Sequence, residues 1–199
     1  MLLRRCRVPQ CLNSAFFRQD ACLQHSADAG AARTAAVDYL LSEARITELS
    51  FDGLRLSALT LSDKTFEQCS FRHCVLEQCD LSRAVVNLCF FDHAGLDTVS
   101  FAGSDIRRTV FGMAHIIDCD FSDSELCECN FNGITCGNSR FSDCDLHSSR
   151  FIGASLDHVS FRNCNLHEVH FGNAIPVECD FRYSNLEDAH HHIPGRRLR

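Results

Sequence analysis

Apolar residues recur every five positions along most of this chain. Starting at Ile46 and stepping by five, 29 positions lead to Leu186, and 27 of them are Phe, Leu, Ile or Val, with Cys136 and Pro176 as the exceptions. Neither the 3.6-residue period of a helix nor the two-residue period of a strand gives this spacing. A fixed repeat determines the architecture, so it is considered before any single helix or strand.

Two residues before each apolar centre, the side chain is small. Of the 28 such positions from Leu49 to Ser184, 23 are Ala, Cys, Ser, Thr or Val. Residues two apart in extended chain point the same way, so the small residue and the centre both face inward. The next small residue comes three steps later, which requires a corner in between. Turn-forming pairs such as Asn132-Gly133 follow the centres and supply that corner.

The spacing of phenylalanine indicates how many such faces make one coil. Every tenth residue from Phe91 to Phe181 is Phe, and Leu or Ile mostly fills the centres between. With four faces, residues 20 apart stack and large rings from opposite walls interleave along the axis, which satisfies close packing. The predicted structural core is then one pure column: Phe51, Phe71, Phe91, Phe111, Phe131, Phe151 and Phe171.

Several units match a known consensus, a small residue, then Asp or Asn, then Leu or Phe, then two variable residues. They include CDLSR (79–83), CDFSD (119–123), CNFNG (129–133), CDLHS (144–148) and CNLHE (164–168). In these units the chain resembles the pentapeptide-repeat family. The resemblance covers residues 46–189 and implies an all-β fold, a right-handed quadrilateral β-helix of about seven coils. At about 4.8 Å per coil, this solenoid is a tower about 35 Å tall.

The ends of the repeat region need covering, because an open β edge invites pairing with another chain. Residues 1–45 are predicted to form an N-terminal segment with a short capping helix around 34–44, in which Thr34 is the N-cap. Residues 1–30 receive no assignment. Residues 190–199, HHHIPGRRLR, are predicted to be a disordered C-terminal tail.

Fourteen cysteines would suggest a disulfide scaffold in a secreted protein. The start of the chain, MLLRRCRVPQ, has charges where a signal peptide is apolar, and no run is long enough to cross a membrane. We therefore expect a cytoplasmic protein whose thiols are free. Nine cysteines fall at the inward small position, where Cys serves as a compact apolar residue: 69, 74, 79, 89, 119, 129, 144, 164 and 179.

The sequence predicts neither a catalytic site nor a metal site. The repeat cysteines point from different walls, and no C-x2-C pair marks a zinc site. His147 and His167 are 20 apart and are expected to stack as an exposed ladder near Cys127, but a convex tower offers no pocket for a Cys-His catalyst. The sequence therefore predicts no enzyme, no catalytic residue, no cofactor and no metal.

Charge indicates the kind of partner. Residues 46–189 hold 22 acidic and 10 basic residues, a net −12, although the whole chain is −7. This disfavours direct nucleic-acid binding, which requires a basic face. Any single Asp before a centre can simply satisfy corner amides, but stacked carboxylates can also attract a basic partner. The predicted partner-binding residues are Asp105, Asp118, Asp120, Asp123, Glu125, Glu128, Asp143 and Asp145.

Two functions stay open, and both are protein binding. Segments such as FEQCSF, FRHCVL and FRNCNL look like the bacterial quinolone-resistance and fluoroquinolone-resistance subset of the family. That resemblance implies a DNA mimic that modulates a type II topoisomerase, DNA gyrase or topoisomerase IV. The alternative is a scaffold, a regulator or an immunity or effector partner unrelated to topoisomerases. A homodimer through the C-terminal coil, where Pro176 replaces a centre, would hide the last open edge.

Overall fold

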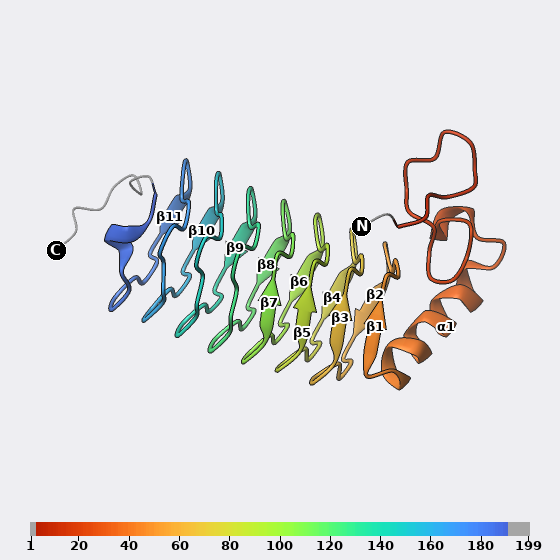
Figure 1. The fold of residues 1–199 in the computed structure, drawn as a ribbon, viewed down its shortest axis with the longest axis horizontal. Helices are drawn as coiled ribbons and strands as arrows, with labels where there is room; N and C mark the ends of the chain where they lie inside the picture. Colours follow the sequence, from red (N-terminus) through yellow and green to blue (C-terminus); the bar gives the residue numbers. More distant parts are fainter. Residues whose placement is uncertain (1–2, 191–199) are drawn as a thin grey trace.

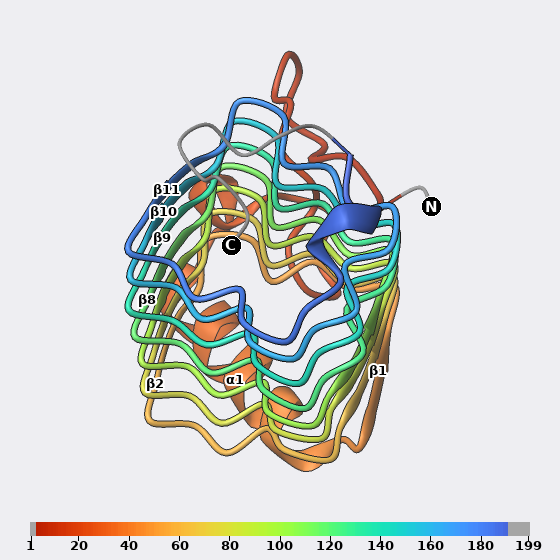
Figure 2. The same cartoon turned by 90° about the vertical axis from the view of Figure 1, so that its left-hand side faces the viewer.

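The computed structural model describes residues 3–190, and these form a tower of stacked coils with one helix at its N-terminal end (Figure 1). Viewed along the tower, each coil is a closed loop with four walls (Figure 2). The predicted quadrilateral β-helix of about seven coils is confirmed. No described helix is long and apolar enough to span a membrane.

Two opposite walls carry the regular strands, each of which is three residues long. Within each wall, neighbouring strands pair in parallel. We call these the β1 wall and the β2 wall (Figure 2). The β1 wall holds β1 (Arg45–Thr47), β3 (Thr65–Glu67), β5 (Val85–Asn87) and β7 (Asp105–Arg107). The β2 wall holds β2 (Arg55–Ser57), β4 (Val75–Glu77), β6 (Gly95–Asp97), β8 (His115–Ile117), β9 (Thr135–Gly137), β10 (Ser155–Asp157) and β11 (Ile175–Val177).

In each of the other two walls, successive coils are joined by single parallel bridges. Ser50 pairs with Ser70 on the wall we call the Phe51 wall, and Thr60 pairs with Asp80 on the Leu61 wall. Every one of these partners is 20 residues away, as is Ile46 from Phe66 in the β1 wall. The predicted register is confirmed, so side chains that share a column in space are 20 apart in sequence.

Phenylalanine rings fill the axis as the spacing predicts. Phe131 stacks on Phe111 with ring centroids 4.9 Å apart and on Phe151 at 4.8 Å. The opposite column meets it edge on, with Phe121 at 6.3 Å and 88°. Offset stacks and T-shaped pairs are the arrangements that aromatic quadrupoles favour. Phe51 through Phe171 are all buried, which confirms the predicted core.

The inward cysteines are packing residues. All fourteen cysteines of the chain are free, and the nine predicted to face inward are buried. Their thiols donate to backbone carbonyls of the neighbouring coil, as Cys74 does to Phe51 O at 3.1 Å. Burial raises the pKa of Cys119 to about 12, so the thiol stays protonated and is a poor nucleophile.

The corners depend on a left-handed backbone conformation, which was not predicted from the sequence. The second residue after nearly every centre has a left-handed φ, for example 59° at Asp123 and 59° at Asp143, and Gly133 takes the same position at 66°. Asp, Asn and Gly adopt this region at the lowest cost. Asp at these corners therefore has a structural reason as well as a charge.

The N-terminal helix begins earlier than predicted. Helix α1 spans Ala29–Ser42, not 34–44, and its N-cap is Asp28, whose side chain accepts from Ala31 N at 2.9 Å. Thr34, the predicted cap, lies inside the helix and donates to Gly30 O. Gly30 is a poor helix former, so the sequence suggested a later start. The Asp28 cap and the alanines that follow outweigh the unfavourable helix propensity of Gly30.

Residues before the helix also cover the first coil. Phe17 stacks on Phe51 with centroids 5.8 Å apart, and its N–H donates to Ser50 O at 2.7 Å. Phe16 and Leu23 join the same buried core as Ala36 and Leu40 of α1. The cover therefore comes from Phe16, Phe17 and η1 (Leu23–His25) as well as from the predicted helix.

At the other end, a short helical turn, η2 (Leu186–Asp188), closes the last coil. Leu186 and Ala189 pack partly buried against the core, and His190 pairs with His170. Apart from His190, the predicted tail, residues 190–199, lies outside the described residues.

Candidate functional site

The first column of predicted acids exists as expected. Asp105 bridges Glu125, and Glu125 bridges Asp145, all on the outer surface of the β1 wall. Asp123 and Asp143 form a second column at the corner between the Leu61 wall and the β1 wall, and the N–H of Asp123 donates to Ser142 O. Asp123 and Glu125 are two residues apart, so their Cα atoms lie within about 7 Å. We call Asp105, Asp123, Glu125, Asp143 and Asp145 the acidic edge.

The other three predicted acids lie elsewhere. Asp118 follows β8 and has a left-handed φ of 52°, so it lies at the corner between the β2 wall and the Leu61 wall. Asp120 lies on the Leu61 wall, where Ser100 and Arg140 flank it in the column, and Glu128 lies at the corner after the β1 wall. The eight predicted residues therefore belong to three walls, and five of them share one edge.

Stacking also brings arginines to several of these acids. Arg107 pairs with Asp105 at 2.6 Å and with Glu125. Arg108 pairs with Glu128 at 3.1 Å, and its guanidinium lowers the pKa of that carboxyl. Arg107 lies two residues from Asp105 and 18 from Glu125, and Arg108 lies 20 residues from Glu128, so these acids are partly neutralised in the folded tower.

Asp120 is neutralised in the same way. Arg140 pairs with it at 2.7 Å. Partial burial raises the pKa of Asp120, but hydrogen bonds from Ser122 and Arg140 outweigh burial and lower it overall. The Asp120 carboxylate also accepts from the Ser122 N–H at 3.0 Å, the corner role weighed in the sequence analysis.

The remaining acids of the edge carry unneutralised charge. Within residues 3–190, Asp123, Asp143 and Asp145 form no ion pair with a basic side chain. Asp143 accepts from Asn163 Nδ2 at 2.6 Å, and Asp145 accepts from Asn165 Nδ2 at 2.9 Å. These hydrogen bonds orient the carboxylates while leaving their charge intact. The edge therefore holds five carboxylates against one arginine, Arg107.

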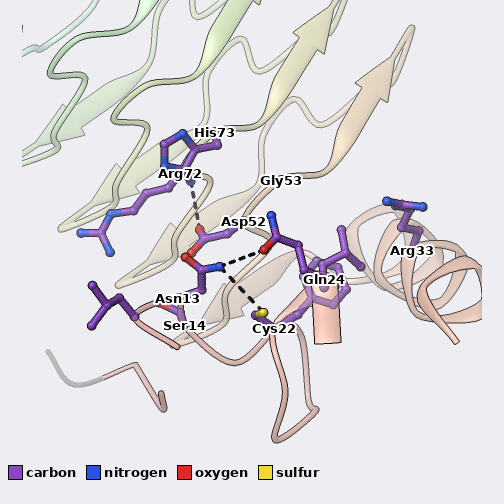
Figure 3. A pocket seen from close by; sticks show the side chains of 12 residues that line it. Asn13, Ser14, Cys22, Gln24, Arg33, Asp52, Gly53, Arg72 and His73 are labelled. Carbon is purple, nitrogen blue, oxygen red and sulfur yellow. Dashed lines mark hydrogen bonds between the residues drawn. The ribbon is translucent and has the colours of Figure 1, made fainter. Parts of the chain in front are cut away.

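A cavity of about 590 Å³ lies where the N-terminal segment meets the first coils (Figure 3). Its walls include Asn13, Cys22 and Gln24 on one side and Asp52 and Arg72 on the other. Asn13 donates to Gln24 at 3.5 Å, and the Asp52 carboxylate accepts from the Arg72 N–H at 3.0 Å. The convex tower predicted from the sequence did not include this cavity, because the cavity depends on how residues 3–28 fold back.

Two groups of side chains in the described part of the chain bring metal-ligating atoms together. One is the predicted histidine ladder, in which His147 and His167 stack with centroids 5.2 Å apart beside Glu168. The ladder is confirmed, and it lies on the surface. The second group is Cys6, Cys11, Cys22 and His25, next to the cavity. Its spacing, C-x4-C-x10-C-x2-H, is readable in the sequence but contains no C-x2-C pair.

Two family models match the repeat region. The model for pentapeptide repeats (8 copies) matches residues 50–87, and the model for the pentapeptide repeat region matches residues 114–191. Together they span more than half of the chain. The chain belongs to the pentapeptide-repeat family. A search among curated proteins found no match.

Solved structures of pentapeptide-repeat proteins match this chain at low identity. HetL, from the cyanobacterium Nostoc sp. strain PCC 7120, is 13% identical, with 78% of this chain and 92% of that chain covered and a TM-score of 0.38. Rfr23, from the cyanobacterium Cyanothece 51142, is 12% identical, with 78% and 97% covered and a TM-score of 0.33.

A third neighbour is full-length QnrB1, described as a plasmid-mediated fluoroquinolone resistance protein. It is 14% identical, with 68% of this chain and 92% of that chain covered and a TM-score of 0.29. At these TM-scores, none of the three likenesses carries an argument about what this chain binds.

Proposed function

We propose that this pentapeptide-repeat protein is a non-enzymatic protein-binding module whose acidic edge docks on a basic protein surface. The observation that supports the proposal is the pair of stacked carboxylate columns, Asp105, Glu125 and Asp145 beside Asp123 and Asp143. They project from a rigid wall, so a partner meets a fixed array of charge and loses little entropy in ordering it. The free thiols suit a reducing compartment, the bacterial cytoplasm.

The finer proposal is that the partner is a type II topoisomerase and that the edge imitates DNA. Over three coils, a span of about 10 Å, the edge presents five carboxylates, or a net charge of −4 with Arg107. Duplex DNA carries one negative charge per about 1.7 Å, or about six over the same length. The local charge density is therefore duplex-like. The resemblance to the quinolone-resistance subset supplies the class of enzyme.

The acidic edge is short, which favours the second function, a scaffold for a partner unrelated to topoisomerases. Three coils correspond to about three base pairs of duplex, and Glu128 and Asp120 outside the edge are already paired with arginines. A short charged patch suits many basic partners. The partner assay below separates the two readings.

A homodimer through the C-terminal coil is a further part of the proposal. Ile175 and Val177 of β11 are 64% and 48% exposed, and Tyr183 is 74% exposed. Pairing two such ends would remove apolar surface and a β edge from water. Sedimentation equilibrium should give twice the mass of one chain, and Ile175→Glu should return it to one. A monomer at all concentrations would contradict the dimer.

The test is a gyrase supercoiling assay over a micromolar titration of protein, with and without a quinolone, together with a gyrase pull-down. The variant Asp123→Asn/Glu125→Gln/Asp143→Asn removes charge from the edge but keeps residues suited to left-handed corners. We expect it to weaken the effect about tenfold, since exposed charges contribute about 0.2–1 kcal/mol each.

The matched control is Glu77→Gln/Asp97→Asn, a stacked exposed pair on the β2 wall, which should leave binding unchanged. If the wild-type protein neither inhibits, protects nor captures gyrase, the topoisomerase proposal is rejected and the scaffold reading stands. If both variants weaken binding equally, the acidic edge is not the docking surface.

A further inference from the structure

Four side chains with metal-ligating atoms converge in the N-terminal segment, outside the repeat region. The ligand atoms of Cys6, Cys11, Cys22 and His25 all lie within 4.8 Å of one another. His25 Nδ1 is 3.4 Å from Cys6 Sγ and 3.3 Å from Cys22 Sγ, and the sulfurs of Cys11 and Cys22 are 3.8 Å apart. We propose that these four residues form a tetrahedral zinc site that holds the N-terminal cover of the tower in place.

The distances fit a tetrahedron around zinc. With Zn–S near 2.3 Å and Zn–N near 2.0–2.1 Å, the edges of the tetrahedron are about 3.8 Å between two sulfurs and about 3.5 Å between sulfur and nitrogen. Three of the six edges measure 3.8, 3.4 and 3.3 Å, and the other three are no longer than 4.8 Å. Three thiols and one imidazole are the Cys3His set of structural zinc sites, and soft sulfur donors select zinc over magnesium or calcium.

The local backbone presents the first two ligands from one hairpin. Arg5 and Ser14 form an antiparallel bridge, and the Cys11 N–H donates to Val8 O at 3.2 Å across a turn in which Gln10 has a left-handed φ of 65°. Cys6 and Cys11 therefore stand on either side of this turn.

The other two ligands come from η1. Cys22 is its N-cap, and the His25 N–H donates to Cys22 O at 2.9 Å. In a 3-10 turn, side chains three residues apart lie on the same side, so Cys22 and His25 face the hairpin together. Figure 3 shows Cys22 beside Asn13, whose side chain donates to the Cys22 sulfur at 3.8 Å.

The segment needs such a link because it has almost no core of its own. Cys6, Ala21 and Cys22 form a separate cluster, with Val8 and Cys11 partly buried against it. Segments below about 40 residues usually require a metal or disulfides to fold stably. A zinc ion bound by four protein ligands has no open position for substrate, so its role would be structural.

What the zinc would fix is the cover over the first coil. Phe16 and Phe17 lie between Cys11 and Cys22 in the chain, and they reach the core through the stack of Phe17 on Phe51. Two ligands precede these rings and two follow them. Binding zinc would therefore close the loop that carries these two rings. The closed loop has less conformational entropy when the segment is detached from the tower, so less entropy is lost when it docks.

The first test is metal content of the full chain, purified under reducing conditions and without a polyhistidine tag, so that no added histidine contributes metal. Mass spectrometry of the metals should find one zinc per chain. Replacement by Co²⁺ should give the visible d–d bands of tetrahedral cobalt and the near-ultraviolet thiolate charge-transfer band. A chelator should release the metal and speed tryptic cleavage after Arg18.

Four variants locate the site. Cys11→Ser/Cys22→Ser should lose the zinc and the cobalt bands, whereas Cys127→Ser, a half-buried thiol of the tower, should keep both. His25→Ala should weaken binding at least tenfold, and His25→Cys should restore it, because a fourth thiolate can replace the imidazole.

Four results would overturn the proposal. One is a reduced full chain that takes up less than one equivalent of zinc. Another is retention of the metal by the double variant. The third is a thiol count of twelve instead of fourteen in the denatured, alkylated protein, which would indicate a Cys11–Cys22 disulfide. Alkylation of Cys22 in the zinc-loaded protein would likewise indicate an exposed thiol and contradict a closed site.

Discussion

The repeat tower and the N-terminal segment solve the same problem, burying apolar surface, by opposite means. In the interior of the tower each coil packs on two neighbours, and Phe131 alone meets four other rings. In residues 3–28, burial depends on Phe16, Phe17 and Leu23 reaching the first coil, and on a small cluster around Cys6 and Cys22. The tower is therefore stabilised by repetition, and the cover by a few specific contacts.

The largest effect is expected in the middle of the tower. Phe131→Ala removes a buried ring that stacks on Phe111 and Phe151, and it should cost about 3–5 kcal/mol of the free energy of unfolding. Urea denaturation followed by circular dichroism measures this loss. Phe90→Ala is the control, because that ring lies outside under Arg72 and should cost less than about 1 kcal/mol. Equal losses would contradict the interior stack as the source of stability.

A smaller and local effect is expected at the cover. Phe17→Ala removes the stack on Phe51 at an end that can relax, so we expect about 2 kcal/mol. Because the cover makes few contacts, it should open below the global free energy of unfolding. Hydrogen exchange should show faster exchange in residues 14–25 and unchanged exchange around Phe131.

Leu12→Ala, at a side chain that is 85% exposed, is the control for the cover and should change neither region. If Phe17→Ala speeds exchange throughout the tower by the same factor, the cover and the coils form one cooperative unit. The contrast between the two regions would then be lost.

The smallest effect is a pH dependence on the β2 wall. The hydrogen-bonded Asp157 carboxylate, 2.7 Å from His158 Nδ1, raises the pKa of that imidazole above its usual 6.5, and Glu178 adds to the shift. A raised folded pKa gives stability that is complete below about pH 6.5 and is lost as pH rises through the folded pKa. The ring is exposed, so the effect on unfolding is small.

A proton NMR titration of His158 should therefore give a pKa above 6.5, and Asp157→Asn should lower it. Asp97→Asn, three coils away on the same wall, should leave it unchanged. An unshifted His158 in the wild-type protein would contradict the ion pair.

The wall pattern was predictable because each unit repeats the same constraint. The centre at Phe131 and the small residue at Cys129 follow from strand parity, and the 20-residue register follows from the spacing of Phe. The helix start was mispredicted, since Gly30 hides a cap at Asp28 that only the folded segment shows to be used. The acidic columns were also predictable, because the register places Asp105, Glu125 and Asp145 in line.

The sequence by itself determined the architecture of this protein: four walls, about seven coils, a Phe core and inward thiols. These are consequences of local periodicity, which repeats the same information many times. Only the tertiary structure decided which acids keep their charge, since Arg107 reaches Glu125 from the coil before it. Only the tertiary structure brought Cys6 and Cys11 to Cys22 and His25. Contacts between residues that share no period depend on how the chain folds back, and no local pattern encodes that path.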